Sequence, residues 1–197
     1  MVLLVSLNTL QLDEGLIRLF DKLSDHRSEV IRIGEIASRL SQYESVPPFL
    51  RSLLVADGTV TMALEAYFLE QIEICTLRQG QVLAPRDVSA LDLNKGEQCL
   101  IREVQLLGVE SSKCYVHAVT VINPSRLSPI LFEQLVDEEE GIGAILRNVA
   151  KGSFREVIHI GTGGLMTDAD IHRRYRVSLN SLPALLITEE FELSSYR

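Results

Sequence analysis

The sequence predicts an α+β fold in which helices cover a mainly antiparallel sheet of about six strands. Two observations lead to this prediction. The spacing of apolar residues changes from the helical period of 3.6 to the strand period of two at about residue 70. The candidate strands also follow one another mostly through short connections, which join antiparallel neighbours, whereas parallel strands need long crossovers.

A chain of 197 residues is long enough for a substantial core, and we expect one domain that spans residues 1–197. Its first part, residues 1–69, is expected to be mainly helical. Apolar residues recur there at helical spacing, first at Leu16, Leu19, Phe20 and Leu23, and again at Ile33, Ile36 and Leu40. Pro47 and Pro48 interrupt the pattern. A short helix over 49–55 is expected to follow, and then a helix that is capped by Thr59 or Thr61 and runs to Tyr67.

The second part, residues 70–197, is expected to form the sheet. The candidate strands cover 70–83, 98–108, 113–122, 154–161, 173–180 and 184–193. Turn residues separate them, among them Asn94-Lys95-Gly96 and the run from Asn180 to Pro183. Between the third and fourth strands, residues 124–148 predict two short helices on either side of the acidic run 137–140.

Composition and charge exclude several classes of protein. The net charge of −8 argues against general nucleic-acid binding, although local arginines can still hold a small anionic ligand. The three cysteines form no C-x-x-C, and the four histidines lack metal-ligand spacing, so we expect neither a disulfide framework nor a metal site. No stretch is apolar enough for a membrane span or a signal peptide, which predicts a cytoplasmic protein. The sequence does not indicate which oligomeric state the protein adopts.

Glu189 is the first candidate for chemistry. Strand side chains alternate between two faces, so the last predicted strand places Glu189 among Leu185, Ile187, Phe191 and Leu193. A carboxylate among large apolar groups is costly unless it is paired, protonated or used.

Arg78 is the second candidate. Alternation in the first predicted strand places Arg78 on one face with Ile72, Ile74 and Thr76. If the isoleucines face the core, so does Arg78, whose planar guanidinium is suited to hold a carboxylate through two hydrogen bonds. The alternative is purely structural, with Arg78 and Glu189 paired to each other or to other buried groups.

Several short segments, taken in order, resemble the chorismate–pyruvate lyase family, including its divergent branch. The resemblance covers about residues 50–193. Its segments are Leu53-Leu54, Asp57-Gly58-Thr59-Val60-Thr61, Thr76-Leu77-Arg78-Gln79-Gly80, Ile101-Arg102-Glu103-Val104, Gly141-Ile142-Gly143, Arg155 to Gly161, Arg173-Arg174-Tyr175-Arg176 and Leu186-Ile187-Thr188-Glu189. Each segment is weak alone, and the specificity lies in their order and spacing.

This resemblance implies an antiparallel sheet with a buried ligand cavity under helical flaps. It also implies a reaction that converts chorismate to 4-hydroxybenzoate and pyruvate without a cofactor or metal. By the same resemblance, Arg78 would bind the ring carboxylate and Glu189 the hydroxyl at the para end, both as catalytic residues. Val60, Thr61, Ala118 and Ile142 would help to enclose the substrate.

The chain departs from the family at two adjacent residues, and two other functions stay open. Ala118-Val119 stands where the best-known members carry glycine and arginine, which puts a second anion site in doubt. Arg102 is either a further positive charge in the cavity or part of a structural ion pair. The same fold resembles the effector-binding domains of bacterial transcription regulators, so a small-molecule sensor without catalysis is one alternative. A lyase for another enolpyruvyl cyclohexadiene is the other.

Overall fold

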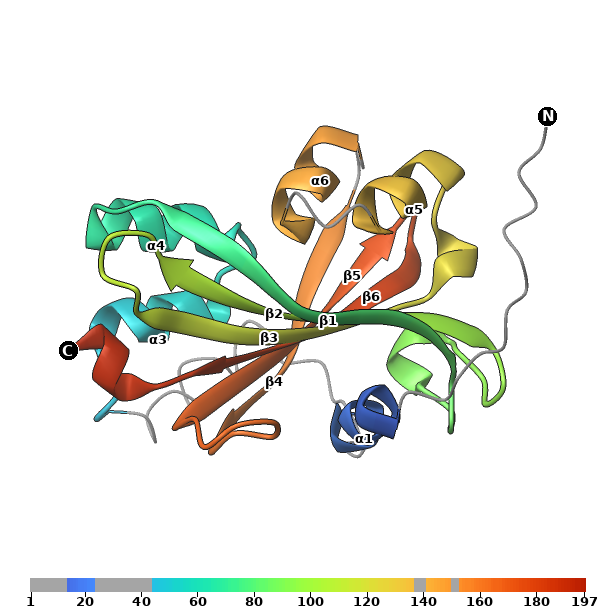
Figure 1. Cartoon of the computed structure of the whole chain (residues 1–197), viewed down its shortest axis with the longest axis horizontal. Coiled ribbons are helices and arrows are strands. Elements are labelled where there is room, and N and C mark those ends of the chain that lie inside the picture. Colours follow the sequence, from blue (N-terminus) through green and yellow to red (C-terminus); the bar gives the residue numbers. More distant parts are fainter. Residues whose placement is uncertain (1–13, 24–43, 137–140, 150–152) are drawn as a thin grey trace.

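The computed structural model describes residues 14–23, 44–136, 141–149 and 153–197 (Figure 1). Six antiparallel strands form one sheet: β1 (Ile72–Leu83), β2 (Gln98–Gly108), β3 (Cys114–Ile122), β4 (Phe154–Thr162), β5 (Ile171–Leu179) and β6 (Leu182–Phe191). Their spatial order is β1-β2-β3-β6-β5-β4, so two meanders of consecutive strands meet where β3 pairs with β6. The predicted α+β class, with its antiparallel sheet and covering helices, is confirmed.

The last hairpin differs from the prediction in one detail. Asn180 and Ser181 have φ angles of 50° and 66°, and β6 begins directly after them at Leu182. A two-residue turn with both residues in the left-handed region matches the twist of a hairpin, so the turn is shorter than the sequence suggested. A register shift follows at Ala184, and beyond it the alternation of β6 proceeds as predicted.

Helices cover both faces of the sheet (Figure 1). On one face, α3 (Pro48–Val55) and α4 (Val60–Phe68) share a core with Leu106, Val116 and Phe191. Beside them on this face, α5 (Pro129–Val136) and α6 (Ile142–Val149) pack on Leu100, Ile122 and Leu185. On the opposite face, α1 (Glu14–Leu23) packs its apolar residues against Ile101, Val119 and Leu186.

The helices agree with the predicted pattern wherever the structure describes them. Leu16, Leu19, Phe20 and Leu23 are all buried on one side of α1. The predicted helical residues Ile33, Ile36 and Leu40 lie outside the described residues. Among the described residues, no helix is long and apolar enough to cross a membrane.

A β-bulge in β1 changes which side chains face which side of the sheet. Thr76 pairs with Val104, but Arg78 pairs with Glu103, so Leu77 is an extra residue in the ladder. A bulge of this kind inverts the alternation beyond it. Arg78 therefore lies on the face opposite to Ile74 and Thr76, and Gln79 pairs with Arg102 in its place.

Candidate functional site

A cavity lies between one face of the sheet and the helices α4 and α6, which cover that face. Its floor comes from all six strands, with Ile74, Arg102, Val104, Leu106, Ala118, Thr120, Arg155, Tyr175, Ile187 and Glu189. The space that the centre of a water-sized sphere can reach is about 80 Å³. Because one water needs about 10–15 Å³ on that measure, the cavity has room for roughly half a dozen waters, or for one small ring compound.

The cover of the cavity consists of two helix beginnings and the residues that lead into them. Residues 58–61 at the start of α4 and residues 141–143 at the start of α6 line it. A Cβ atom on Gly143 would lie 3.0 Å from Cγ2 of Thr59, so a glycine here lets the two segments approach closely. The sequence-predicted residues Val60, Thr61 and Ile142 all belong to this cover.

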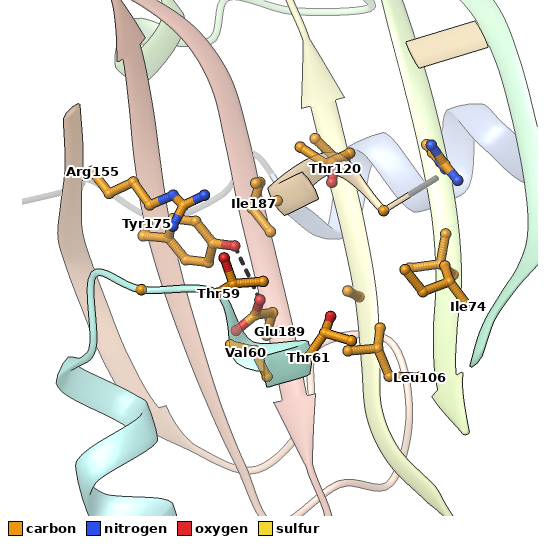
Figure 2. A pocket seen from close by; sticks show the side chains of 17 residues that line it. Thr59, Val60, Thr61, Ile74, Leu106, Thr120, Arg155, Tyr175, Ile187 and Glu189 are labelled. Atoms are coloured by element: carbon orange, nitrogen blue, oxygen red, sulfur yellow. Dashed lines mark hydrogen bonds between the residues drawn. The ribbon is translucent and has the colours of Figure 1, made fainter. Parts of the chain in front are cut away.

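Glu189 lines the cavity and both of its carboxylate oxygens have protein partners. Its Oε1 accepts a hydrogen bond of 3.0 Å from the Tyr175 hydroxyl, as Figure 2 shows, and its Oε2 accepts one of 2.6 Å from Nε of Arg173. Arg173 is only 1% exposed and also donates from NH1 to the backbone carbonyls of Leu53 and Ala56. Glu189 is thus a buried, oriented hydrogen-bond acceptor at the edge of an open space.

Burial keeps Tyr175 protonated in this arrangement. Desolvation raises the pKa of its hydroxyl above the ordinary value, and the negative charge of Glu189 raises it further. A neutral phenol donates a hydrogen bond to the carboxylate, and the remaining lone pairs of Glu189 can accept a hydrogen bond from a ligand. Tyr175 was not among the residues that the sequence singled out.

The expectation that Arg78 shares an interior space with Glu189 is wrong. The Arg78 side chain is 49% exposed, and its Nε forms an ion pair of 2.9 Å with Oε2 of Glu103. Glu103 neighbours the cavity residues Arg102 and Val104 in β2 and therefore points to the other face of the sheet. The cause is the bulge at Leu77, because simple alternation would have carried Arg78 to the cavity face.

Arg102 occupies the place in the cavity that was expected for Arg78. It is 1% exposed, lines the cavity, and its NH2 donates to Oγ1 of Thr76 at 3.4 Å. Strand β2 alternates regularly, so the face shared by Leu100, Arg102, Val104 and Leu106 is the signal that identified it as a possible cavity charge.

Three further arginines are buried in the sheet or line the cavity. Arg173 and Arg174 are each 1% exposed, and burial lowers the pKa of Arg174 to about 10. Arg155 lines the cavity beside Tyr175 (Figure 2). In the structure Arg173 lies on the same face of β5 as Tyr175 and pairs with Glu189 in register.

Ala118 and Val119 lie on opposite faces of β3. Ala118 lines the cavity and pairs with Glu189, whereas Val119 is buried with Ile101 and Leu186 in the core on the other face. Within the described residues, no group of three or more histidine, cysteine, aspartate and glutamate side chains is arranged to hold a metal ion.

Comparison with known proteins decides the family. The family model for chorismate lyase matches residues 36–195. The chain belongs to the chorismate lyase family. Curated relatives named chorismate pyruvate-lyase from Mycobacterium tuberculosis and Mycobacterium bovis are 26% identical, over 75% of this chain and 81% of theirs.

Solved structures with the same fold include the protein PhnF and its effector domain. PhnF from Mycobacterium smegmatis matches with a TM-score of 0.53 at 13% identity, over 91% of this chain and 93% of that one. Its effector domain matches with the same TM-score and identity, over 70% of this chain and 90% of that domain. At this identity the likeness shows the fold alone.

Proposed function

We propose that the protein is a chorismate–pyruvate lyase, which eliminates pyruvate from chorismate and forms 4-hydroxybenzoate without a cofactor. The observation that supports this best is the cavity itself, where a buried arginine and a buried, oriented carboxylate line the same space. The family and the relatives named chorismate pyruvate-lyase support the same reaction.

The positions of Arg102 and Glu189 suit a ring with an acid at one end and a hydroxyl at the other. Arg102 is in β2 and Glu189 in β6, with β3 between them. Arg102 is level with Ile187, two residues along β6 from Glu189, so the backbones of Arg102 and Glu189 are roughly 12 Å apart. Ala118 of β3 lies between them in the floor, and its short side chain leaves space above it for a ring. Arg102 would bind the ring carboxylate, since a guanidinium pairs with both carboxylate oxygens at once.

Glu189 would accept the hydrogen bond of the ring hydroxyl. Arg173 holds its Oε2 and Tyr175 donates to its Oε1, which fixes the orientation of the carboxylate before the substrate arrives. Because the reaction ends in an aromatic ring, correct orientation of the ether bond contributes more than a strong general base. We therefore assign Glu189 a positioning role, with Val60, Thr61 and Ile142 closing the cavity over the ring.

The experiment is to incubate the purified protein with chorismate and to measure 4-hydroxybenzoate by chromatography and pyruvate by an enzyme-coupled assay. We expect the two products in equal amounts, at a rate that a metal chelator leaves unchanged. Binding of chorismate or 4-hydroxybenzoate without turnover would instead identify a sensor, the function of effector domains with this fold. Turnover of an isomeric enolpyruvyl cyclohexadiene, but not of chorismate, would identify a related lyase.

A further inference from the structure

Arg155 lies at the cavity end formed by β4 and β5, next to Tyr175 (Figure 2). In the β4–β5 register it is opposite Val177, and thus on the same face of the sheet as Tyr175. It is half-buried, and its NH1 donates to the backbone carbonyl of Asp57 at 2.8 Å. Its positive charge acts on Tyr175, where it lowers the pKa of the hydroxyl against the larger effect of burial.

The charged side chains among the described lining residues are Arg102, Arg155 and Glu189. Arg173 compensates the charge of Glu189, since its Nε lies 2.6 Å from Oε2. The two lining arginines come from β2 and β4, and strands β3, β6 and β5 separate them. The cavity therefore presents positive charge on both sides of Glu189, which favours a ligand with two separate anionic groups.

We propose that Arg155 binds the second carboxylate of the substrate, that of the enolpyruvyl group, and thereby selects a ring compound with two carboxylates. This inference rests on the proposed lyase function. With the ring carboxylate on Arg102 and the ring hydroxyl on Glu189, the carbon beside the hydroxyl carries the enolpyruvyl ether. That ether can point along β5 toward Arg155. The chain thus gains a second anion-binding residue although Val119 stands where better-known members have arginine.

The proposed contact has a chemical consequence for the elimination. The ether C–O bond breaks and its electron pair passes to the enolpyruvyl oxygen, while the neighbouring ring carbon loses its hydrogen as a proton and the ring becomes aromatic. The released enolate takes up one proton on its methylene carbon, equal in number to the proton lost from the ring, and becomes pyruvate, so atoms and charge balance. Negative charge grows on the leaving oxygen, next to the carboxylate that Arg155 holds, and the contact strengthens in the transition state.

A second hollow adjoins the cavity at this end. It has a volume of about 300 Å³, and Arg155, Gly58, Thr59 and Gly143 line both spaces. Arg155 thus stands at the boundary between the cavity and a wider space, on the side where we expect the leaving group. Pyruvate held by Arg155 would lie next to a way out, while the ring product stays deeper in the cavity.

The test compares Arg155→Ala and Arg155→Lys with Arg176→Ala as a matched control. Arg176 is in β5 on the opposite face, where its Nε and NH2 lie 3.0 and 2.6 Å from Oε2 of Glu156. For Arg155→Ala we expect the KM for chorismate to rise roughly 10- to 100-fold, as for loss of a hydrogen bond between charged groups, with a smaller fall in kcat. Its Kd for 4-hydroxybenzoate should stay within about twofold of the parent, because this product has no second carboxylate. Lysine should restore part of the chorismate affinity.

The same measurements distinguish the ways in which the inference can fail. If Arg155 only supports the loop through Asp57, the affinities for chorismate and for 4-hydroxybenzoate will fall together, because that loop leads into the cavity cover. If Arg155→Ala changes neither the KM for chorismate nor the Kd for 4-hydroxybenzoate while the parent converts chorismate, the inference is wrong and the proposed function stands. If the parent neither binds nor converts chorismate, both are wrong.

Discussion

The two faces of the sheet carry similar charged groups but use them differently. On the cavity face, Glu189 pairs with Arg173 and Tyr175 and still borders an open space. On the opposite face, Oε2 of Glu103 lies 2.9 Å from Nε of Arg78, and its Oε1 lies 2.9 Å from Nε2 of His117.

Glu190 is a second buried carboxylate on the face opposite to the cavity. It accepts hydrogen bonds from the backbone nitrogens of Leu165, Met166 and Thr167, and from the Thr167 hydroxyl at 2.7 Å. These contacts bind the loop between β4 and β5 to the sheet.

This difference shows that a buried charge alone does not mark a functional site. Glu190 is 1% exposed and Glu189 is 6% exposed, and the two are neighbours in one strand. Alternation separates them onto opposite faces, and only Glu189 lines the cavity. We therefore infer that residues of the cavity face act on the ligand, whereas those of the other face stabilise the sheet and its loop.

The largest effect is expected for Arg102. Arg102→Ala removes the charge-assisted, two-pronged contact that we propose to the ring carboxylate, and should cost about 2–5 kcal/mol of transition-state stabilisation. Lysine should recover only part of the loss, because it restores the charge but not the planar fork. The measurements are kcat/KM for chorismate and the Kd for 4-hydroxybenzoate.

Arg78→Ala is the matched control for Arg102. Arg78 belongs to the same strand pair but lies half-exposed on the opposite face, in an ion pair with Glu103. We expect this variant to keep the parent's product affinity. A large loss of 4-hydroxybenzoate binding in Arg78→Ala, with Arg102→Ala unaffected, would contradict the assignment of faces.

The second prediction concerns Glu190 on the opposite face. Glu190→Gln keeps the shape but removes the charge that holds the loop nitrogens, and hydrogen bonds to charged groups contribute about 1.5–3 kcal/mol each. We expect the free energy of unfolding in urea to fall by about 2–3 kcal/mol, and the Kd for 4-hydroxybenzoate to stay near that of the parent below the unfolding transition. If binding fell as strongly as in Arg102→Ala, the two faces would not be separate in function.

The sequence predicted most of the sheet and part of the site, and the exceptions have a physical cause. The strands were predictable because their alternation and turns are local properties of the chain. Glu189 was assigned to the apolar face because the alternation of β6 is regular where it lies, whereas Ala118 was assigned to the cavity by the family resemblance. Arg78 was misplaced because a bulge depends on how β1 pairs with β2, and no local residue pattern marks Leu77 as the extra residue.

Burial of the β5 arginines could not be predicted for a related reason. The strand pattern around Arg173 does not show that it is buried, because only the fold brings the carbonyls of Leu53 in α3 and of Ala56 just after α3 to its guanidinium. The partner of Glu189 was therefore missed, although a structural ion pair had been considered. Contacts between segments about 120 residues apart are set by topology rather than by local spacing.

The third prediction tests how Glu189 is held. Tyr175→Phe removes the donor to Oε1 but leaves the ion pair with Arg173, so the carboxylate keeps its charge and loses part of its orientation. We expect a loss of about 1–2 kcal/mol in kcat/KM for chorismate and a similar loss in unfolding free energy. Unchanged kinetics would show that Arg173 alone positions Glu189.

The smallest effect is expected for a carboxylate at the sheet end, away from the cavity. Glu70 accepts hydrogen bonds from the Tyr115 hydroxyl and from the backbone nitrogens of Ser111 and Glu110, and these lower its pKa from 4.5 to about 2. Because the folded pKa lies below the unfolded one, the stabilisation is present above pH 4.5 and is lost as the pH falls toward 2. Melting temperatures of the parent and Glu70→Gln should therefore differ at neutral pH and converge in acid. The affinity for 4-hydroxybenzoate should be the same in both proteins at neutral pH, because Glu70 lies outside the cavity lining.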